Sequence, residues 1–512
     1  MAARPVGPAP ADATAPHGVA FPEVDGARST TATGRAVFAD AARAVDAQLA
    51  RRIEAERDWR RGYLVHARHL VEAELEGRDE GLATPAAGLA SLHDRFEFLR
   101  GGEALGLREA CRAGGRASLG SVEVGGEATG GPGPLRVPYR GRRLEGDALH
   151  RQLDRWVEAG TVEPSFARAI RRLVANPDWL DLSDQTVAVL GAGAELGPLH
   201  SLAEWGATVA PVDLPGAARW ERILGMIRRG RGRAVVPVAG GGPTDAEGLA
   251  ASAGVDLVTG LPELAAWLER LDGPLTLGNY AYADGATHVR VSMAADALAV
   301  HLAEQRDDLS LAVLATPTDA FAVPADAVEM AQRRFDETGL VRGVEAALRR
   351  VSRGRAFAPN YTGLVTTREG LEVGIADSLV RQQGQNYALA KRLQRWRATI
   401  AREAGIPVSI NVAAPTRTRS VMRNRALAAA YAGARRFGVE VSDPSTSNTL
   451  MAALLAHDLR NPESAASPAT ALAHPAELFT EAANHGGLWR IPFAPRSALG
   501  FAVVAGMVPR GA

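Results

Sequence analysis

The chain has 512 residues, 46% of them hydrophobic, and its 58 acidic and 58 basic residues give a formal net charge of zero. Such a length predicts roughly two to four domains, and the interspersed charge excludes the basic field typical of nucleic-acid-binding proteins. The only cysteine cannot form an internal disulfide, and no apolar run approaches the roughly 20 residues that span a bilayer. We therefore expect a cytoplasmic protein without a membrane span that binds a small molecule.

The first third of the chain has mainly helical patterning. Residues 1–26 are rich in Ala and Pro and lack the apolar core of a signal peptide, so we expect a flexible tail. Apolar residues then recur at three- and four-residue spacing over 36–77, which predicts one or two amphipathic helices. Helical patterning continues to residue 174, interrupted by a glycine-rich stretch at 114–133 that predicts a linker. These tracts predict a mostly helical N-terminal domain over residues 27–180.

From residue 181 to 512 the pattern alternates between strands and helices. Residues 186–213 predict a strand, a glycine turn, a helix and a second strand. Further strand candidates, separated by helical tracts, are 233–238, 274–280, 309–315 and 406–413. This alternation predicts an α/β fold with a Rossmann-like, doubly wound parallel sheet. The segment 324–384 exceeds what a minimal domain of this kind needs, and we interpret it as a lid or substrate-binding insertion.

The first strand of this half ends in a glycine-rich turn. Gly191, Gly193 and Gly197 are spaced G-x-G-x-x-x-G, and Asp213 ends the second strand. Glycines let the backbone approach a pyrophosphate at the positive end of a helix, and the carboxylate can accept hydrogen bonds from ribose hydroxyls. We therefore predict a dinucleotide site. A tight turn without a ligand, a flavin site and an S-adenosylmethionine site are the alternatives.

The choice between NAD and NADP depends on charge near the ribose. Asp213 favours NAD because a carboxylate repels a 2′-phosphate. The arginine-rich run 228–233 could instead bind that phosphate if its loop folds back, which would favour NADP, or it could be a solvated turn. NAD is the predicted cofactor and NADP the alternative.

Lys391 is the only lysine among 58 basic residues. Arginine therefore serves wherever else a positive charge is needed, and the lysine is either a product of drift or a site that needs a compact ammonium. Tyr387 precedes it by four residues, which places both side chains on one face of a helix. Because a neighbouring ammonium lowers the pKa of a phenol, the pair predicts a general acid/base.

The residues after this pair resemble those of the short-chain dehydrogenase/reductase superfamily. There the Y-x-x-x-K helix runs into a strand with an N-x-x-x-P motif and a later threonine, and Asn411, Pro415 and Thr418 occupy matching positions here. The resemblance covers roughly residues 184–430, about half of the chain. It implies that Pro415 and Thr418 contact the cofactor, the threonine near its carboxamide or phosphate.

The same resemblance assigns roles to the catalytic pair and to two other residues. It implies that Tyr387 exchanges a proton with the substrate oxygen, while Lys391 holds the nicotinamide ribose and lowers the tyrosine pKa. Asp256 matches an acid placed beside adenine, and Asn279 matches the strand end that lines the cofactor, although a turn residue is an equal interpretation. The sequence departs from the family pattern at Thr416, where a glycine is usual, and no asparagine follows in the next helix for the usual proton relay.

The hydroxyl that orients the substrate has more than one candidate. If the insertion follows the fifth strand, the segment "LATPTD" places Thr316 or Thr318 at the matching position. If it does not, Ser378 in "IADSLV" is the nearest candidate.

These features together predict an NAD(P)-dependent oxidoreductase that transfers hydride to or from a carbonyl, alcohol or enoyl substrate. The alternatives are an epimerase or dehydratase that uses the nicotinamide transiently, a methyltransferase, and a non-catalytic dinucleotide-binding scaffold. We predict no metal site, because His66 and His69 lack a third ligand. The resemblance also implies a homodimer or tetramer that associates through the long helices flanking the active site.

Overall fold

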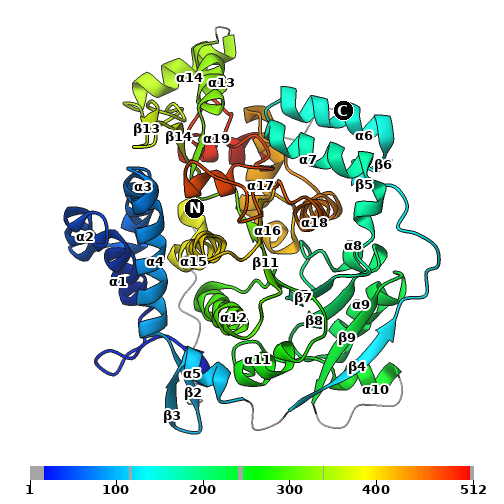
Figure 1. Cartoon of the computed structure of the whole chain (residues 1–512). Coiled ribbons are helices and arrows are strands. Elements are labelled where there is room, and N and C mark those ends of the chain that lie inside the picture. The colour runs from blue at the N-terminus through cyan, green and yellow to red at the C-terminus, as the bar shows by residue number, and fades with distance from the viewer. Residues whose placement is uncertain (1–16, 115–117, 240–245, 338–339, 508–512) are drawn as a thin grey trace.

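The computed structural model describes residues 17–114, 118–239, 246–337 and 340–507 (Figure 1). Its centre is a seven-stranded sheet in an α/β chain. Across the sheet the strands are β15 (Val408–Val412), β11 (Leu309–Ala315), β10 (Leu275–Asn279), β7 (Thr186–Leu190), β8 (Thr208–Val212), β9 (Arg233–Ala239) and β4 (Leu119–Gly125). The first six are parallel and β4 is antiparallel. The parallel strands begin at β7 in the middle, run outward to β9 and continue from β10 on the other side, an order compatible with a Rossmann-like fold.

The register of the sheet aligns the carboxyl ends of its central strands. Leu190 at the end of β7 pairs with Val212 of β8 on one side and with Asn279 of β10 on the other. On the next strands, Ala315 of β11 pairs with Val412 of β15. The loops that follow these strands therefore emerge along one edge, which we call the carboxyl edge.

Helices cover both faces of the sheet. Alternate side chains of a strand point to opposite faces, so Ala188 and Leu190 join one hydrophobic core while Val187 and Val189 join another. The first core contains α11 (Leu261–Glu269), α12 (Gly285–Gln305) and α15 (Gln385–Glu403). The second contains α8 (Leu199–Glu204), α9 (Ala217–Arg228) and α18 (Pro444–Arg460). Burial on both sides explains why these strands are continuously apolar.

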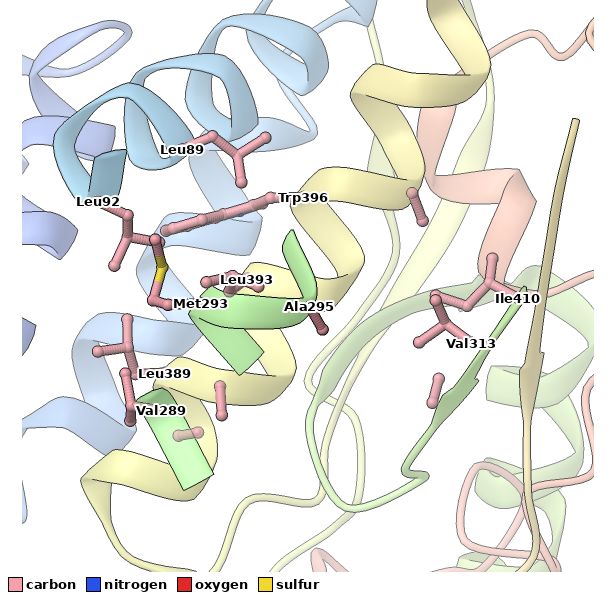
Figure 2. Close-up of a cluster of buried hydrophobic side chains, with 14 of the residues drawn as sticks. Leu89, Leu92, Val289, Met293, Ala295, Val313, Leu389, Leu393, Trp396 and Ile410 are labelled. Atoms are coloured by element: carbon pink, nitrogen blue, oxygen red, sulfur yellow. The ribbon is translucent and has the colours of Figure 1, made fainter. Parts of the chain in front are cut away.

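The helices α1 (Thr30–Arg43), α2 (Ala47–Glu54), α3 (Trp59–Glu74) and α4 (Arg78–Arg95) form a further layer. Figure 2 shows α15 between α4 and α12, with Leu89 and Leu92 of α4 beside Trp396 of α15. The indole lies so close to α4 that a Cβ on Gly88 would be 2.3 Å from it. The packing therefore covers the face of α15 that points away from the sheet.

Other parts of residues 27–180 join the rest of the chain directly. The strand β4 pairs with β9 over its whole length, Leu119 opposite Ala239 and Gly125 opposite Arg233. It covers the edge of the parallel sheet, which would otherwise expose unpaired N–H and C=O groups. The predicted boundary at residue 180 therefore separates β4 from the sheet to which this strand belongs. The remaining elements before residue 180 are β1 (Gly18–Ala20), which precedes this region, and β2 (Glu97–Arg100), β3 (Glu103–Gly106), α5 (Leu107–Arg112), β5 (Val137–Tyr139), β6 (Arg142–Leu144), α6 (Gly146–Glu158) and α7 (Pro164–Ala175) within it.

The predicted insertion forms a separate small sheet with helices between β11 and α15. Its elements are β12 (Ala320–Pro324), α13 (Ala325–Asp336), α14 (Leu340–Val351), β13 (Val365–Thr366) and β14 (Glu372–Asp377). It follows the fifth parallel strand, so the condition that favoured Thr316 and Thr318 over Ser378 is met. After β15 the chain forms α16 (Arg419–Arg423), α17 (Arg425–Ala434), α18 and α19 (Pro495–Met507). Within the described ranges, every helix is too short or too polar to cross a membrane.

Candidate functional site

The Tyr387 and Lys391 side chains lie near the start of α15, close to the ends of β10 and β11. The Tyr387 ring stacks on His288 of α12, with ring centroids 5.6 Å apart. The Lys391 Nζ donates hydrogen bonds to the Leu314 carbonyl of β11 (3.2 Å) and to Oε1 of Gln394 (3.0 Å). One helical turn separates the two residues, so α15 presents a phenol and an ammonium together at the carboxyl edge.

Burial controls the ionisation of this pair. It lowers the pKa of Lys391 to about 8, an effect that the negative charge of Asp319 opposes. It raises the pKa of Tyr387 above its usual range, while the interaction with the Thr316 hydroxyl lowers it. The predicted lowering of the tyrosine pKa by Lys391 is therefore not seen here. Desolvation is the largest cause of the Tyr387 shift, and the Lys391 ammonium is bonded to Leu314 and Gln394.

A chain of hydroxyl groups leads away from Tyr387. The Thr316 Oγ1 lies 2.7 Å from the Thr318 Oγ1, which accepts a hydrogen bond from Nε2 of Gln383 at 2.7 Å. The Ser378 side chain is fully buried, and its hydroxyl has no hydrogen-bond partner among the described residues. Of the three predicted hydroxyls, Thr316 is the one that interacts with the Tyr387 side chain.

The glycine turn follows β7 directly and packs against the segment after β10. Gly191 has a φ of +80°, and a Cβ there would lie 2.6 Å from the Cα of Ala281. Only glycine fits both this conformation and this contact. The Tyr280 N–H donates to the Leu190 carbonyl (3.0 Å), which fixes the two loops together. This juxtaposition places Asn279 beside the turn, at the point where strand order reverses and open α/β sheets bind ligands.

The helix after the turn differs from the prediction. The Gly197 N–H closes a turn onto the Ala194 carbonyl (3.0 Å), and α8 begins at Leu199 after Pro198 and has only six residues. A helix this short contributes little macrodipole, and its first N–H groups come after the glycines. Any anion at this turn would therefore rely on the backbone of the turn itself.

The predicted ribose ligand Asp213 is already engaged within the protein. Its carboxylate accepts hydrogen bonds from the N–H groups of Gly193 and Leu214, both at 2.8 Å, and pairs with Arg219 Nε at 3.2 Å. A carboxylate has about four acceptor positions, so about one remains for a ligand. Arg219 meanwhile places a guanidinium directly beside this carboxylate.

The arginine-rich run 228–233 lies at the amino-terminal ends of the parallel strands, opposite the carboxyl edge. It connects the end of α9 to the start of β9, whereas the glycine turn follows the end of β7. Arg231 pairs with Asp181 and Arg233 with Glu123. The run does not fold back toward the glycine turn, so the condition under which it would bind the phosphate is not met, because strand direction separates the amino and carboxyl ends of a parallel sheet.

Asp256 lies near the carboxyl end of β8. The neighbouring Val255 N–H donates to the Asp213 backbone carbonyl (3.0 Å), and the Asp256 Oδ1 accepts from the Val258 N–H (2.8 Å). The structure therefore brings the two predicted acids to the same part of the carboxyl edge.

The loop after β15 reaches across to the glycine turn. The Pro415 carbonyl accepts a hydrogen bond from the Ser442 N–H (2.8 Å), and the Thr418 hydroxyl lies 2.9 Å from that of Ser420. In the next position, Arg419 donates its N–H to Oε2 of Glu195 (2.7 Å) and pairs with the same carboxylate through Nε (3.0 Å). These two interactions between Arg419 and Glu195 connect the two loops that the motifs predicted to hold the cofactor.

Two buried polar atoms at this edge lack partners. The Oδ1 of Asn279 and the Nε2 of His288 make no hydrogen bond to any described residue. Buried polar groups are normally paired, so unpaired ones call for an explanation such as a bound ligand or water. Both lie on the segment that leaves β10, next to the Tyr387 ring in the case of His288.

No family model, curated protein or solved structure matches the chain. Its function must be inferred from the residues at the carboxyl edge.

Sequence patterns did not indicate several residues of this site. His288 is part of an apolar helical tract, where a lone histidine is usually a core residue. Gln383 and Arg419 carry no motif, and their roles arise from contacts with Thr318 and Glu195 that are distant in sequence. For His288 a signal was present, because it falls nine positions after Asn279 in the loop and helix that follow β10.

Proposed function

We propose that this protein is an NAD(P)-dependent oxidoreductase of the short-chain dehydrogenase/reductase type with a Rossmann-like, doubly wound sheet. The observation that carries the proposal is the position of Tyr387 and Lys391 on one face of α15, beside Thr316 at the end of β11. The order of the parallel strands supports it, because such sheets bind dinucleotides at the carboxyl edge.

The residues at the edge fit a nicotinamide dinucleotide. The Gly191 turn admits a close backbone approach, and Asp213 retains an acceptor for a ribose hydroxyl. Lys391 and Thr418 would hold the nicotinamide half, and the unpaired Asn279 Oδ1 offers it an acceptor. When bound, the nicotinamide supplies or accepts the hydride. Asp213 favours NAD, whereas the Arg219 guanidinium beside it would bind the 2′-phosphate of NADP.

The chain's own residues account for the proton chemistry. The Tyr387 hydroxyl would give a proton to the substrate oxygen in reduction and take it back in oxidation. The Thr316 and Thr318 hydroxyls, 2.7 Å apart, each both donate and accept, so they can orient that oxygen and relay a proton. Lys391 would keep its ammonium near the phenol, where it stabilises the phenolate formed during turnover.

The test begins with fluorescence titrations of the purified protein with NADH and NADPH, followed by turnover with carbonyl and enoyl compounds. We expect one of the two nucleotides to bind and to be oxidised with a carbonyl substrate. The Tyr387→Phe variant should lower kcat by about 10²- to 10⁴-fold, the usual contribution of general acid catalysis, with unchanged cofactor affinity. Tyr361→Phe is the matched control, since that hydroxyl donates to the Trp489 carbonyl within the insertion packing.

Three outcomes would contradict the proposal. Failure to bind either nucleotide excludes the cofactor, and full activity in Tyr387→Phe excludes the tyrosine. A substrate that is converted without net change in nicotinamide absorbance would instead indicate an epimerase or dehydratase.

A further inference from the structure

His288 is a buried histidine with one ring nitrogen unused. It lies in the first turn of α12 and is 1% exposed. Its Nδ1 accepts a hydrogen bond from the Ala283 N–H at 3.4 Å, while its Nε2 has no partner among the described residues. Because Nδ1 acts as the acceptor, the neutral ring carries its proton on Nε2. The protein thus buries an N–H donor without an acceptor.

The surroundings of the ring belong to the candidate active site. The ring stacks on Tyr387, at an interplanar angle of 21°, and packs against Tyr282 with centroids 5.1 Å apart. Tyr282 in turn donates its hydroxyl to Asp284. Lys391 is near enough for its charge to act on the imidazole. Charged groups near this cluster include Asp284, Lys391 and Asp319, whose charge acts on Tyr387.

These surroundings keep the imidazole neutral. Burial lowers the pKa of His288 to about 3, and the positive charge of Lys391 acts in the same direction. A proton on both nitrogens is therefore disfavoured at working pH, and His288 cannot serve as a general acid there. What it can do is donate a hydrogen bond through Nε2, as neutral imidazoles do in other active sites.

We propose that His288 donates a hydrogen bond from Nε2 to the substrate oxygen that receives the proton of Tyr387. This inference rests on the proposed function and sharpens it by naming the substrate class. Two donors converging on one oxygen stabilise the negative charge that develops when a C=O bond is reduced. The site would therefore act on ketones or aldehydes rather than on isolated C=C bonds. His288 transfers no proton and forms no covalent bond, so the reaction balance is unchanged.

Kinetics of two substitutions test the inference. His288→Leu removes the donor at similar volume, and we expect kcat with a carbonyl substrate to fall by about 10²- to 10³-fold, as when one oxyanion donor is lost. His288→Gln retains an N–H donor at similar reach and should recover most of that loss. The affinity for NAD(P)H should be the same in both variants. The control is His301→Leu on the same helix, a buried histidine that faces Glu269 instead.

The outcomes separate this inference from the proposed function. If the wild type reduces carbonyls and His288→Leu retains its kcat, the inference is wrong and the function stands. A loss of NAD(P)H affinity at unchanged kcat would assign His288 to the cofactor and also overturn the inference. A wild type that neither binds nor oxidises the nucleotides refutes the proposed function.

The role of His288 can also be tested on the wild-type protein, so that the result does not depend on the folding of a variant. Long-range ¹H–¹⁵N NMR reports the tautomer of each histidine, and we expect His288 to be neutral with its proton on Nε2 from about pH 5 to 8. Its Nε2 signal should shift when an unreactive ketone analogue is added. A cationic ring, a proton on Nδ1, or an unmoved Nε2 signal in the presence of bound analogue would refute the inference.

Discussion

Lys391 shows how one side chain depends on both its identity and its surroundings. It is the single lysine of the chain, and its Nζ donates to the Leu314 carbonyl and to Gln394. An arginine fork is wider, stays charged at any working pH and could not make these two bonds in the same space. Burial lowers the pKa of this ammonium to about 8, within the range where enzymes are assayed.

This ionisation predicts a pH dependence of activity. In the proposed mechanism the charged form of Lys391 holds the ribose and stabilises the phenolate, and this form is present below the folded-state pKa. Activity should therefore fall as the pH rises through about 8, while the pKa of Tyr387 lies above that range. The measurement is kcat/KM for the carbonyl substrate across the alkaline range. Any residual activity of Lys391→Arg should not decrease in this pH range, because arginine stays charged. A wild-type activity that does not change with pH there would contradict the role of Lys391.

Among the secondary-structure elements, α15 packs tightly against α4. Its first turns present the catalytic pair, while Trp396 two turns later is buried against α4. Because the C-terminal half of α15 is packed firmly against α4, its N-terminal half is held in a fixed position. Gly88 is the point of closest approach, because its absent side chain leaves room for the indole.

We predict that Gly88→Ala destabilises the protein. A Cβ would lie 2.3 Å from the Trp396 ring, so the two helices must separate, and overpacking of this kind typically costs about 1–3 kcal/mol. Urea unfolding of the purified variant measures the change. Gly500→Ala in α19 makes the same substitution in a helix interior with nothing within 4 Å and should be neutral or stabilising. Equal stability of the two variants would show that the helices are not tightly seated.

Patterns of single elements indicated much of the parallel sheet. The strand predicted at 309–315 is β11, and the strands predicted near 186 and before 213 are β7 and β8. Continuous apolar runs bounded by turn residues are strong signals, because such strands are buried on both faces. The helix after the glycine turn was harder to predict, because the chain makes a further turn from Ala194 to Gly197 and α8 begins only after Pro198.

For the whole molecule, a buried ionic cluster connects the N-terminal and C-terminal parts. Glu163, which precedes α7, accepts hydrogen bonds from His485 Nε2 (2.9 Å) and from two nitrogens of Arg490 (3.0 and 2.6 Å). Its side chain is only 4% exposed. Burial alone would raise the pKa of this carboxyl, but His485 and Arg490 together lower it to about 2.

We predict that Glu163→Gln removes a large part of the stability and its acid dependence. Breaking a buried pair leaves Arg490 partly uncompensated and typically costs about 3–5 kcal/mol. Because the folded-state pKa is depressed, the stabilisation is present above the ordinary value of 4.5 and is lost as the pH falls toward about 2. Urea titrations at several pH values measure both effects.

The matched control is Glu329→Gln, which removes one partner of an exposed pair with Arg333 on α13. Surface pairs contribute about 0–1 kcal/mol, so its stability should stay near that of the wild type. If the two glutamine variants unfold alike, the Glu163 cluster does not join the two parts of the chain energetically.

The arrangement of layers also bears on oligomerisation. The resemblance implied association through the long helices beside the active site, which are α12 and α15. Here α4 packs against α15, with Leu89 and Leu92 beside Trp396 and with Leu92 near Met293 of α12 (Figure 2). A helix of the same chain therefore occupies one face of α15, and the oligomeric state stays a prediction.

The sequence by itself determined the local features of this protein. Tyr387 and Lys391 had to share a helix face because four residues make about one turn, and the glycine spacing had to produce a turn after a buried strand. Only the tertiary structure decided which distant groups meet there. Strand direction placed the arginine-rich run at the amino-terminal ends of the strands, desolvation raised the pKa of Tyr387, and the packing of α12 beside α15 brought His288 onto the phenol ring. Contacts between residues far apart in the chain depend on packing and burial, which local patterns do not specify.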